Sequence, residues 1–162
     1  MQPLNEMKLI FESRSNNESF ARIVAAAFVS QLDPTIEELT EVKTAVSEAV
    51  TNSIIHGYEN RIGEIEMVCR LFIDSVEIVI KDLGKGIDDV EQARQMLYTS
   101  SPDNERSGMG FTVMETFMDK VDVISGVGVG TTVVMFKKFS SLSKTGQTQN
   151  ITSQTPDKTE QS

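Results

Sequence analysis

The sequence predicts an α+β fold, a two-layer sandwich in which helices cover one face of a mostly antiparallel, mixed sheet. Three observations lead to this prediction. Apolar residues recur every three or four positions over two segments within residues 15–57, as in amphipathic helices. They alternate strictly with more polar residues over 64–81, as in the strands of a hairpin. After residue 110, a short helical segment is followed by two further segments of strand character.

The N-terminal part contains one predicted strand, 7–13, and two predicted helices. Each helix begins with the spacing of a capping box, Ser15 with Glu18 and Thr35 with Glu38. The apolar residues of the first helix are Phe20, Ile23, Val24, Ala27 and Phe28, and those of the second are Ile36, Leu39, Val42, Val46, Ala49, Val50 and Ile54.

The rest of the domain is predicted to consist of four strands, two short helices and a loop. Gly57 is suited to cap the end of the second helix. Residues 98–110 are polar and aperiodic, so we expect them to form a mobile loop. An antiparallel hairpin is predicted over 64–81, helices over 88–97 and 111–117, and strands over 121–125 and 131–139.

Composition indicates one globular domain, residues 1–139, followed by a disordered polar tail, residues 140–162, that has almost no apolar side chains. The net charge of −9 argues against partners that are nucleic acids or anionic membranes. The chain has one cysteine and one histidine, which excludes an internal disulfide and zinc sites of several thiolates or imidazoles. We see neither a signal peptide nor an apolar stretch that could span a bilayer, and therefore expect a cytoplasmic protein.

Two polar patterns in the first 90 residues could carry chemistry. Glu48 and Asn52 lie one turn apart on one face of the second predicted helix, where a carboxylate can accept a proton and an amide oxygen can bind Mg²⁺. A solvated helix face explains the same pair. Asp82 directly follows an apolar strand and precedes Gly84 and Gly86. Its carboxylate could accept a hydrogen bond from an exocyclic amine, although an ordinary turn between a strand and a helix would look similar.

Two glycine-containing patterns follow. Residues 107–111, Ser-Gly-Met-Gly-Phe, open a predicted helix, and the free amides of a helix N-terminus suit a phosphate chain. A hinge without a ligand is the alternative. Residues 126–130 contain three glycines between two strands and precede Thr131. Such a segment is usually a simple hairpin, although a threonine hydroxyl there could meet a base or a bridging water.

The order and spacing of the four patterns resemble the nucleotide-binding boxes of the Bergerat-fold ATPases, which include gyrase and the histidine kinases. The resemblance covers about residues 7–138. Within this superfamily, residues 7–11, 47–58 and 105–111 are similar to the sporulation anti-sigma F factors of Bacillus. The Bergerat fold is itself a two-layer sandwich, in agreement with the fold class predicted from the pattern.

The resemblance implies an anti-sigma factor that is also an enzyme. Members of the family are homodimers that bind and inhibit sporulation sigma factor F. They also use Mg-ATP to phosphorylate a serine of an anti-anti-sigma protein, the antagonist of the inhibitor. It implies no direct contact with nucleic acid or membrane.

The resemblance also implies roles for particular residues. Glu48 corresponds to the general base, Asn52 to the Mg²⁺ ligand, and Asp82 to the residue that recognises the amine of adenine. The other residues expected on the nucleotide side, for ATP or ADP, are His56, Gly84, Gly86, Ser107, Gly108, Met109, Gly110, Phe111 and Thr131.

For three further residues, two alternative roles stay open. Glu18 and Arg22 correspond to positions that contact the protein partners, although they could equally form an exposed ion pair of little energetic value. Arg106 lies in residues 98–110, which resemble the lid over the phosphates, and is either a catalytic residue that stabilises charge on the γ-phosphate or a solvated loop residue. An ATPase or nucleotide-gated switch without protein-kinase activity, in which Glu48 activates water, is the alternative function. A detached ATP domain of a histidine kinase is a third.

Overall fold

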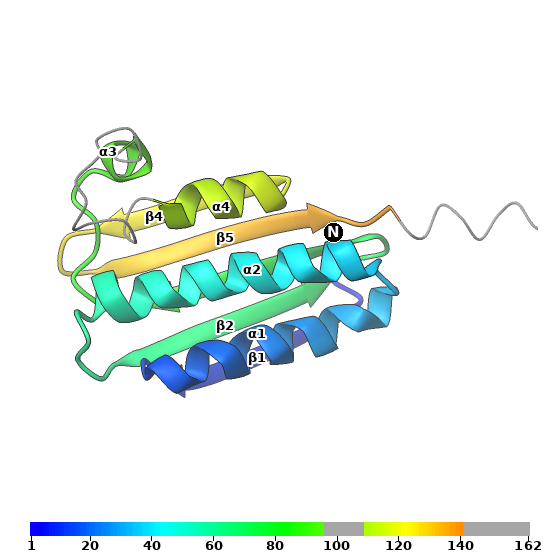
Figure 1. Ribbon diagram of the computed structural model, residues 1–162, viewed down its shortest axis with the longest axis horizontal. Helices are drawn as coiled ribbons and strands as arrows, with labels where there is room; N and C mark the ends of the chain where they lie inside the picture. The colour runs from blue at the N-terminus through cyan, green and yellow to red at the C-terminus, as the bar shows by residue number, and fades with distance from the viewer. Residues whose placement is uncertain (96–108, 141–162) are drawn as a thin grey trace, which may run out of the picture.

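The computed structural model describes residues 1–95 and 109–140, which form a sheet layer and a helix layer (Figure 1). The sheet has five strands in the order β1-β2-β3-β5-β4, and each neighbouring pair is antiparallel. The predicted fold class is confirmed. The strands are β1 (Asn5–Glu12), β2 (Glu64–Leu71), β3 (Ser75–Asp82), β4 (Lys120–Gly126) and β5 (Gly130–Lys138). The helices are α1 (Ser15–Val29), α2 (Ile36–Asn52), α3 (Val90–Gln95) and α4 (Met109–Phe117), with a 3-10 turn at Ser30–Leu32 and a π-helical turn at Ser53–Gly57.

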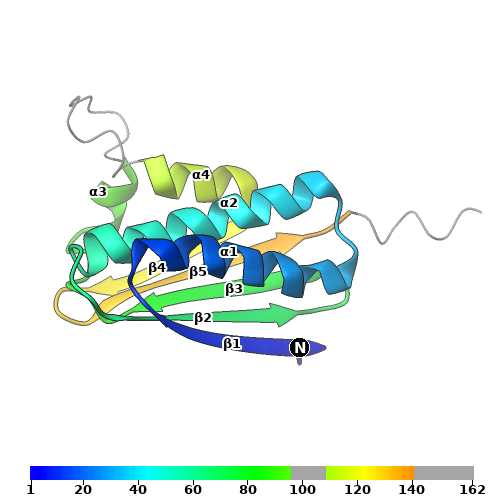
Figure 2. The ribbon, with the colours of Figure 1, turned by 60° about the horizontal axis from the view of Figure 1, so that its bottom comes forward.

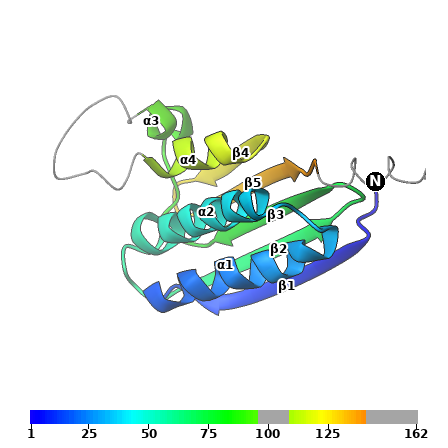
Figure 3. The same ribbon diagram turned by 45° about the vertical axis from the view of Figure 1, so that its right-hand side comes forward.

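Helices α1, α2 and α4 cover the same face of the sheet (Figure 2). Helix α1 packs on β1 and β2, α2 on β3, and α4 on β4 (Figure 3). The core between the layers contains alternate residues of the strands, such as Ile65, Met67, Ile78 and Ile80, which are fully buried. The period-two pattern of the sequence therefore marks the sheet face that the helices cover.

The apolar face predicted for α1 is only partly right. Val24 and Phe28 are half-buried and pack against the core. Phe20, Ile23 and Ala27 are exposed to solvent. The residues that α1 buries against α2 and the sheet are Ala21, Ala25, Ala26 and Val29. Small side chains let α1 approach closely, and Phe20 and Ile23 lie on its outer side.

One of the two predicted capping boxes is present. At the start of α2, Thr35 accepts a hydrogen bond from the backbone of Glu38 (3.1 Å), whose carboxylate accepts one from the backbone of Thr35 (2.9 Å). At the start of α1, the residue in the N-cap position is Arg14 and no side chain caps the helix. The carboxylate of Glu18 contacts Ser47 of α2 instead, so this part of the prediction is wrong.

Two predicted helix ends are also corrected. Gly57 does not cap α2, because the helix continues through the π-helical turn. The positive φ values after this turn belong to Glu59 and Asn60. Helix α3 begins at Val90 rather than at Asp88, since Asp89 accepts a hydrogen bond from the backbone of Gln92 (2.9 Å) in the manner of an N-cap.

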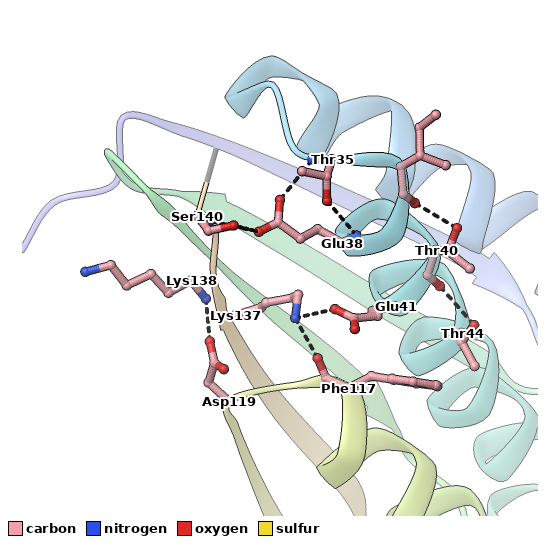
Figure 4. A network of polar contacts seen from close by, with 11 residues as sticks. Thr35, Glu38, Thr40, Glu41, Thr44, Phe117, Asp119, Lys137, Lys138 and Ser140 are labelled. Atoms are coloured by element: carbon pink, nitrogen blue, oxygen red, sulfur yellow. Dashed lines mark hydrogen bonds and ion pairs between the residues drawn. The ribbon is translucent and has the colours of Figure 1, made fainter. Parts of the chain in front are cut away.

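A polar network joins the start of α2 to the ends of α4 and β5 (Figure 4). The ammonium group of Lys137 is buried; it lies 2.7 Å from the carboxylate of Glu41 and donates to the carbonyl oxygen of Phe117 (2.8 Å). The backbone and hydroxyl of Ser140 both donate to Glu38 (2.8 Å each). The network closes the end of the sandwich that lies far from Asp82. Within the described residues, none of the helices is long and apolar enough to cross a membrane.

Candidate nucleotide site

The opposite end of the sandwich is organised around Asp82, the last residue of β3. Its carboxylate is buried and accepts three hydrogen bonds: from the hydroxyl of Ser53 (2.9 Å), from the backbone of Gly84 (2.9 Å) and from the backbone of Thr131 (3.3 Å). A buried carboxylate needs such donors, because burying an unpaired charge is costly. The side chain is thereby fixed in one orientation between α2, β3 and β5.

Glycines surround this carboxylate because the backbones approach too closely for side chains. A Cβ atom on Gly57 would lie 3.0 Å from the carboxylate of Asp82, and one on Gly84 would lie 2.2 Å from the carbonyl oxygen of Gly57. Gly130 combines a φ of 104° with a Cβ position 2.1 Å from the carbonyl oxygen of Asp82. The spacing of glycines in the sequence thus reflects one crowded meeting of three chain segments.

The hairpin between β4 and β5 is tied to the loop after Asp82. The backbone of Ile87 donates to the hydroxyl of Ser125 (2.7 Å), which also lies 2.8 Å from the hydroxyl of Thr131. The backbone of Gly128 donates to the carbonyl oxygen of Lys85 (2.8 Å). Gly86, with a φ of 76°, would place a Cβ atom 2.0 Å from the carbonyl oxygen of Gly126. The loop with Gly84 and Gly86 and the hairpin at residues 126–130, 40 or more positions apart in the sequence, therefore form one structure.

Glu48 and Asn52 meet the first turn of α4. A Cβ atom on Gly110 would lie 3.0 Å from Nδ2 and 3.1 Å from Oδ1 of Asn52, and 3.3 Å from Oε2 of Glu48. The first backbone amides of a helix have no partner within it, so they are available to an anion. The structure thus brings a carboxylate, an amide oxygen and a helix N-terminus together, and Phe111 anchors that turn in the core.

The ionisable groups of the site are set by burial and by neighbouring charges. Burial, and next the charge of Glu18, raise the pKa of Glu48. Burial, and next the charge of Lys85, lower the pKa of His56, which favours a neutral imidazole. A carboxylate with a raised pKa is a stronger proton acceptor than an ordinary one.

A single amide oxygen next to a carboxylate suits Mg²⁺ only if a ligand supplies further oxygens. Among the described residues, no cluster of three or more histidines, cysteines or acidic side chains could hold a metal by itself. Mg²⁺ commonly takes one or two protein ligands together with phosphate oxygens and water. Asn52 and the helix N-terminus at Gly110 fit that arrangement, in which phosphates would lie at α4.

Glu18 and Arg22 lie on α1 and differ in solvent exposure. The side chain of Glu18 is 19% exposed and that of Arg22 is 42% exposed, and the two are 3.5 Å apart. Beside them, Phe20 and Ile23 present apolar side chains to solvent. The described residues exclude most of the expected lid, with Arg106, Ser107 and Gly108. The side chain of Met109 also lies outside the described part.

Some residues of the site were missed by sequence reasoning. The hydroxyl of Tyr58 accepts a hydrogen bond from the backbone of Leu83 (2.9 Å) and donates to the carbonyl oxygen of Glu64. It thereby fixes the loop after Asp82. Ser53 and Ser125 were not predicted either, and a lone serine or tyrosine has no local signal that distinguishes it from a surface residue.

Comparison with known proteins identifies the domain. Residues 11–137 match the family of histidine kinase-like ATPase domains. The chain is 60% identical over 139 residues to an anti-sigma F factor of Clostridium novyi, covering 85% of this chain and 97% of that protein. This chain belongs to the anti-sigma F factor family. Its nucleotide-binding ATPase domain spans most of its length.

Other anti-sigma F factors are similarly close. Those of Clostridium beijerinckii and Oceanobacillus iheyensis are 61% and 58% identical, over 86% and 84% of this chain and 98% and 94% of theirs. Solved structures agree in fold alone. The RsbU and RsbW domains of a Mycobacterium tuberculosis protein match with a TM-score of 0.61 at 17% identity, over 85% of this chain and 32% of that one. A blue-light activated histidine kinase of Erythrobacter litoralis matches with a TM-score of 0.50 at 18% identity, over 74% and 41%.

Proposed function

We propose that the chain is an anti-sigma factor and a protein-serine kinase. It binds and inhibits sporulation sigma factor F, and it uses Mg-ATP to phosphorylate and inactivate its anti-anti-sigma antagonist. It acts as a homodimer in the cytoplasm. Membership of the anti-sigma F factor family supports the first activity. The observation that carries the second is the convergence of Glu48, Asn52 and the N-terminus of α4 at Gly110.

Each residue would have a distinct part in the transfer. Asp82 would accept a hydrogen bond from the exocyclic amine of adenine, with Ser53 and two backbone amides holding its carboxylate in place. The amides of the first turn of α4 would bind phosphate oxygens, and Asn52 would hold Mg²⁺. The metal would neutralise charge on the phosphates. Glu48 would accept the proton of the attacking serine hydroxyl, a role that its raised pKa favours.

The outer side of α1 is the surface that would receive the protein partners. Arg22 is accessible there, and Phe20 and Ile23 are exposed where a solvated helix would carry polar residues. The open face of the sheet, by contrast, carries ion pairs between neighbouring strands, such as Lys8 with Glu66 (2.6 Å) and Arg70 with Glu77 (2.7 Å). Because those charges already have partners, the apolar helix face is the better candidate for a protein interface.

Two variants test the assignment of roles. Phosphorylation is measured with labelled ATP and the anti-anti-sigma protein. Binding of sigma factor F is measured separately, and nucleotide affinity is measured for ATP and, as a comparison, for GTP. Glu48→Gln keeps the shape of the side chain and removes the base. We expect it to bind Mg-ATP and sigma factor normally and to phosphorylate its partner about 10²–10⁴ times more slowly. Asn52→Ala removes the metal ligand, and so should also weaken Mg-ATP binding in calorimetry.

The outcomes separate the alternatives. Phosphorylation by Glu48→Gln at the wild-type rate would show that Glu48 is not the base. Release of inorganic phosphate without labelled protein would favour a nucleotide-gated ATPase. Equal affinities for ATP and GTP would contradict the role of Asp82 in recognising adenine, because an oxygen acceptor of guanine would face its carboxylate.

A further inference from the structure

Three polar side chains lie in a row across the sheet at the candidate site. Asp82 on β3 pairs with Thr131 on β5, and Thr131 pairs in turn with Ser125 on β4. Strand β5 lies between the other two (Figure 2). Residues that are paired across antiparallel strands project from the same face of the sheet, and the carboxylate of Asp82 meets Ser53, which directly follows α2. Thr131 and Ser125 therefore also face the helix layer, beside the carboxylate proposed to accept the amine of adenine.

The hydroxyl of Ser125 has more neighbours than protons. It accepts a hydrogen bond from the backbone of Ile87 (2.7 Å), because a backbone amide can only donate. Its own single proton can be donated either to the carbonyl oxygen of Gly130 (3.1 Å) or to the hydroxyl of Thr131 (2.8 Å). Two hydroxyl oxygens at the second distance need a proton between them. One of the two hydroxyls must therefore donate to the other.

The direction of this hydrogen bond decides what Thr131 offers to a ligand. If Ser125 donates to Gly130, the hydroxyl of Thr131 donates to Ser125 and presents only lone pairs to the site. If Ser125 donates to Thr131, the proton of Thr131 is available to a ligand. Adenine has an acceptor, the ring nitrogen N1, directly next to the amine proposed for Asp82. It therefore needs a donor beside that carboxylate, which only the second arrangement supplies.

We propose that Ser125 is a positioning residue for base recognition: it donates to the hydroxyl of Thr131 and so directs the proton of Thr131 to N1 of adenine, directly or through one water. The inference deepens the proposed function and rests on its assignment of Asp82 to the amine of adenine. N1 of guanine carries a hydrogen, so the same orientation would disfavour guanine at a second point of the base.

A purely structural role of Ser125 would have a different signature. Its contact with Ile87 ties the loop after Asp82 to the hairpin of β4 and β5, as does the hydrogen bond from Gly128 to Lys85. Loss of this tie would weaken the binding of every adenine nucleotide by a common factor. Loss of the proton orientation would remove only the contribution of N1.

The probe that separates the two roles is 1-deaza-ATP, in which a C–H group replaces N1 of adenine. Calorimetry of the full chain with Mg²⁺ gives the dissociation constants of this analogue and of ATP, and their ratio measures the contribution of N1. For the wild type we expect the analogue to bind about tenfold more weakly, which corresponds to one hydrogen bond. In Ser125→Ala and in Thr131→Val the ratio should fall to near unity.

Two further variants are the controls. Ser125→Thr keeps a hydroxyl and should retain the wild-type ratio. Thr132→Val removes the hydroxyl next along β5, which projects from the opposite face of the sheet because side chains alternate along a strand. It should also retain the wild-type ratio.

The outcomes are distinct. An unchanged ratio in Ser125→Ala, with both nucleotides weakened equally, would make Ser125 a structural tie and overturn the proposal, and so would a ratio near unity in the wild type. If Ser125→Ala fails to fold, Ser125→Cys replaces it, since a thiol is only a weak donor and the ratio should again fall. A wild-type chain that shows the expected ratio but phosphorylates no serine would contradict the kinase function and leave this inference standing.

Discussion

Helix α2 carries two glutamates whose surroundings are opposite. Near its start, Glu38 accepts hydrogen bonds from Thr35 and Ser140. Burial acts to raise its pKa, but these hydrogen bonds outweigh burial and lower the pKa to about 2. Ten positions later, Glu48 has no such donors among the described residues, and both burial and Glu18 raise its pKa.

In the proposed function, the two ends of α2 would serve different purposes, stability at the start and chemistry near the end. A carboxylate near the N-terminus of a helix is also stabilised by the helix dipole, which disfavours a carboxylate near the C-terminus. At the first end, charges are paired and close the sandwich around Lys137. At the second end, the Glu48 carboxylate has no hydrogen-bond partner among the described residues, and the proposed nucleotide would lie beside it. We expect substitutions at the first end to change stability and substitutions at the second to change binding.

Removal of the buried cation should have the largest effect on stability. Lys137→Ala leaves Glu41 without its partner and the carbonyl oxygen of Phe117 without its donor. We expect a loss of about 3 kcal/mol in the free energy of unfolding, measured in urea, with little change in the ATP affinity of the folded protein.

The neighbouring lysine is the control for this prediction. Lys138 is 66% exposed and pairs with Asp74 at 3.0 Å, so Lys138→Ala should cost at most about 1 kcal/mol. Equal losses in the two variants would show that the end of the sandwich does not depend on the buried ion pair.

A methyl group added at Gly110, near the Glu48 end of α2, should weaken nucleotide binding and leave stability nearly unchanged. In Gly110→Ala the new Cβ atom would press on the side chains of Asn52 and Glu48. We expect about a tenfold loss of Mg-ATP affinity in calorimetry, roughly 1.4 kcal/mol. The free energy of unfolding without nucleotide should change by less than about 1 kcal/mol, since only flexible side-chain ends are displaced. Thr116→Ala, on an exposed part of α4, should change neither quantity, and an unaltered affinity in Gly110→Ala would place the ligand elsewhere.

The smallest effects are on the pH dependence of stability, and they should differ in sign. The pKa of Glu38 is lower in the folded state, so its contribution is present above its ordinary pKa of 4.5 and disappears as the pH falls toward about 2. Glu38→Gln should therefore lose stability at pH 7, by about 1 kcal/mol, together with part of the capping box.

Glu48 should act in the opposite direction. Because its pKa is raised by folding, the folded state binds the proton more strongly, and stability decreases as the pH rises through the range above 4.5. Glu48→Gln should therefore unfold at a higher urea concentration than the wild type at pH 7. Parallel unfolding series from pH 4 to pH 7 measure both variants, and effects of equal sign would break the comparison between the two ends.

The elements that could be predicted from the sequence are those governed by local pattern. Strict alternation located the outer bounds of the hairpin of β2 and β3 to within a residue, because one side of each strand is buried under helices. The capping box of Thr35 needs only neighbours in the chain. The box at Ser15 failed because Ser47, distant in sequence, binds the carboxylate of Glu18. On α1, Phe20 and Ile23 were mistaken for core residues, since alanines make the closest contacts of this helix.

The candidate site also has features that local pattern predicts and features that depend on tertiary packing. Glu48 and Asn52 could be placed on one helix face by spacing, and Asp82 at the end of a strand by the apolar run before it. The convergence of these residues with Gly110 depends on the packing of α4 against α2, which no local pattern encodes; the family resemblance pointed to it. Gly57 was recognised as a necessary glycine for the wrong reason, because the carboxylate that excludes its side chain lies 25 positions further along the chain.

The hydrogen bond from Thr131 to Asp82 joins residues that lie 49 positions apart, and it exists because β5, the last strand, inserts between β3 and β4. Contacts of such long sequence separation cost loop-closure entropy and slow folding. A chain still emerging from the ribosome without β5 would have an unfinished sheet and no place for a nucleotide. With Asp82 in its proposed role, nucleotide capture would be restricted to molecules that have completed folding, and a bound nucleotide would stabilise only that state.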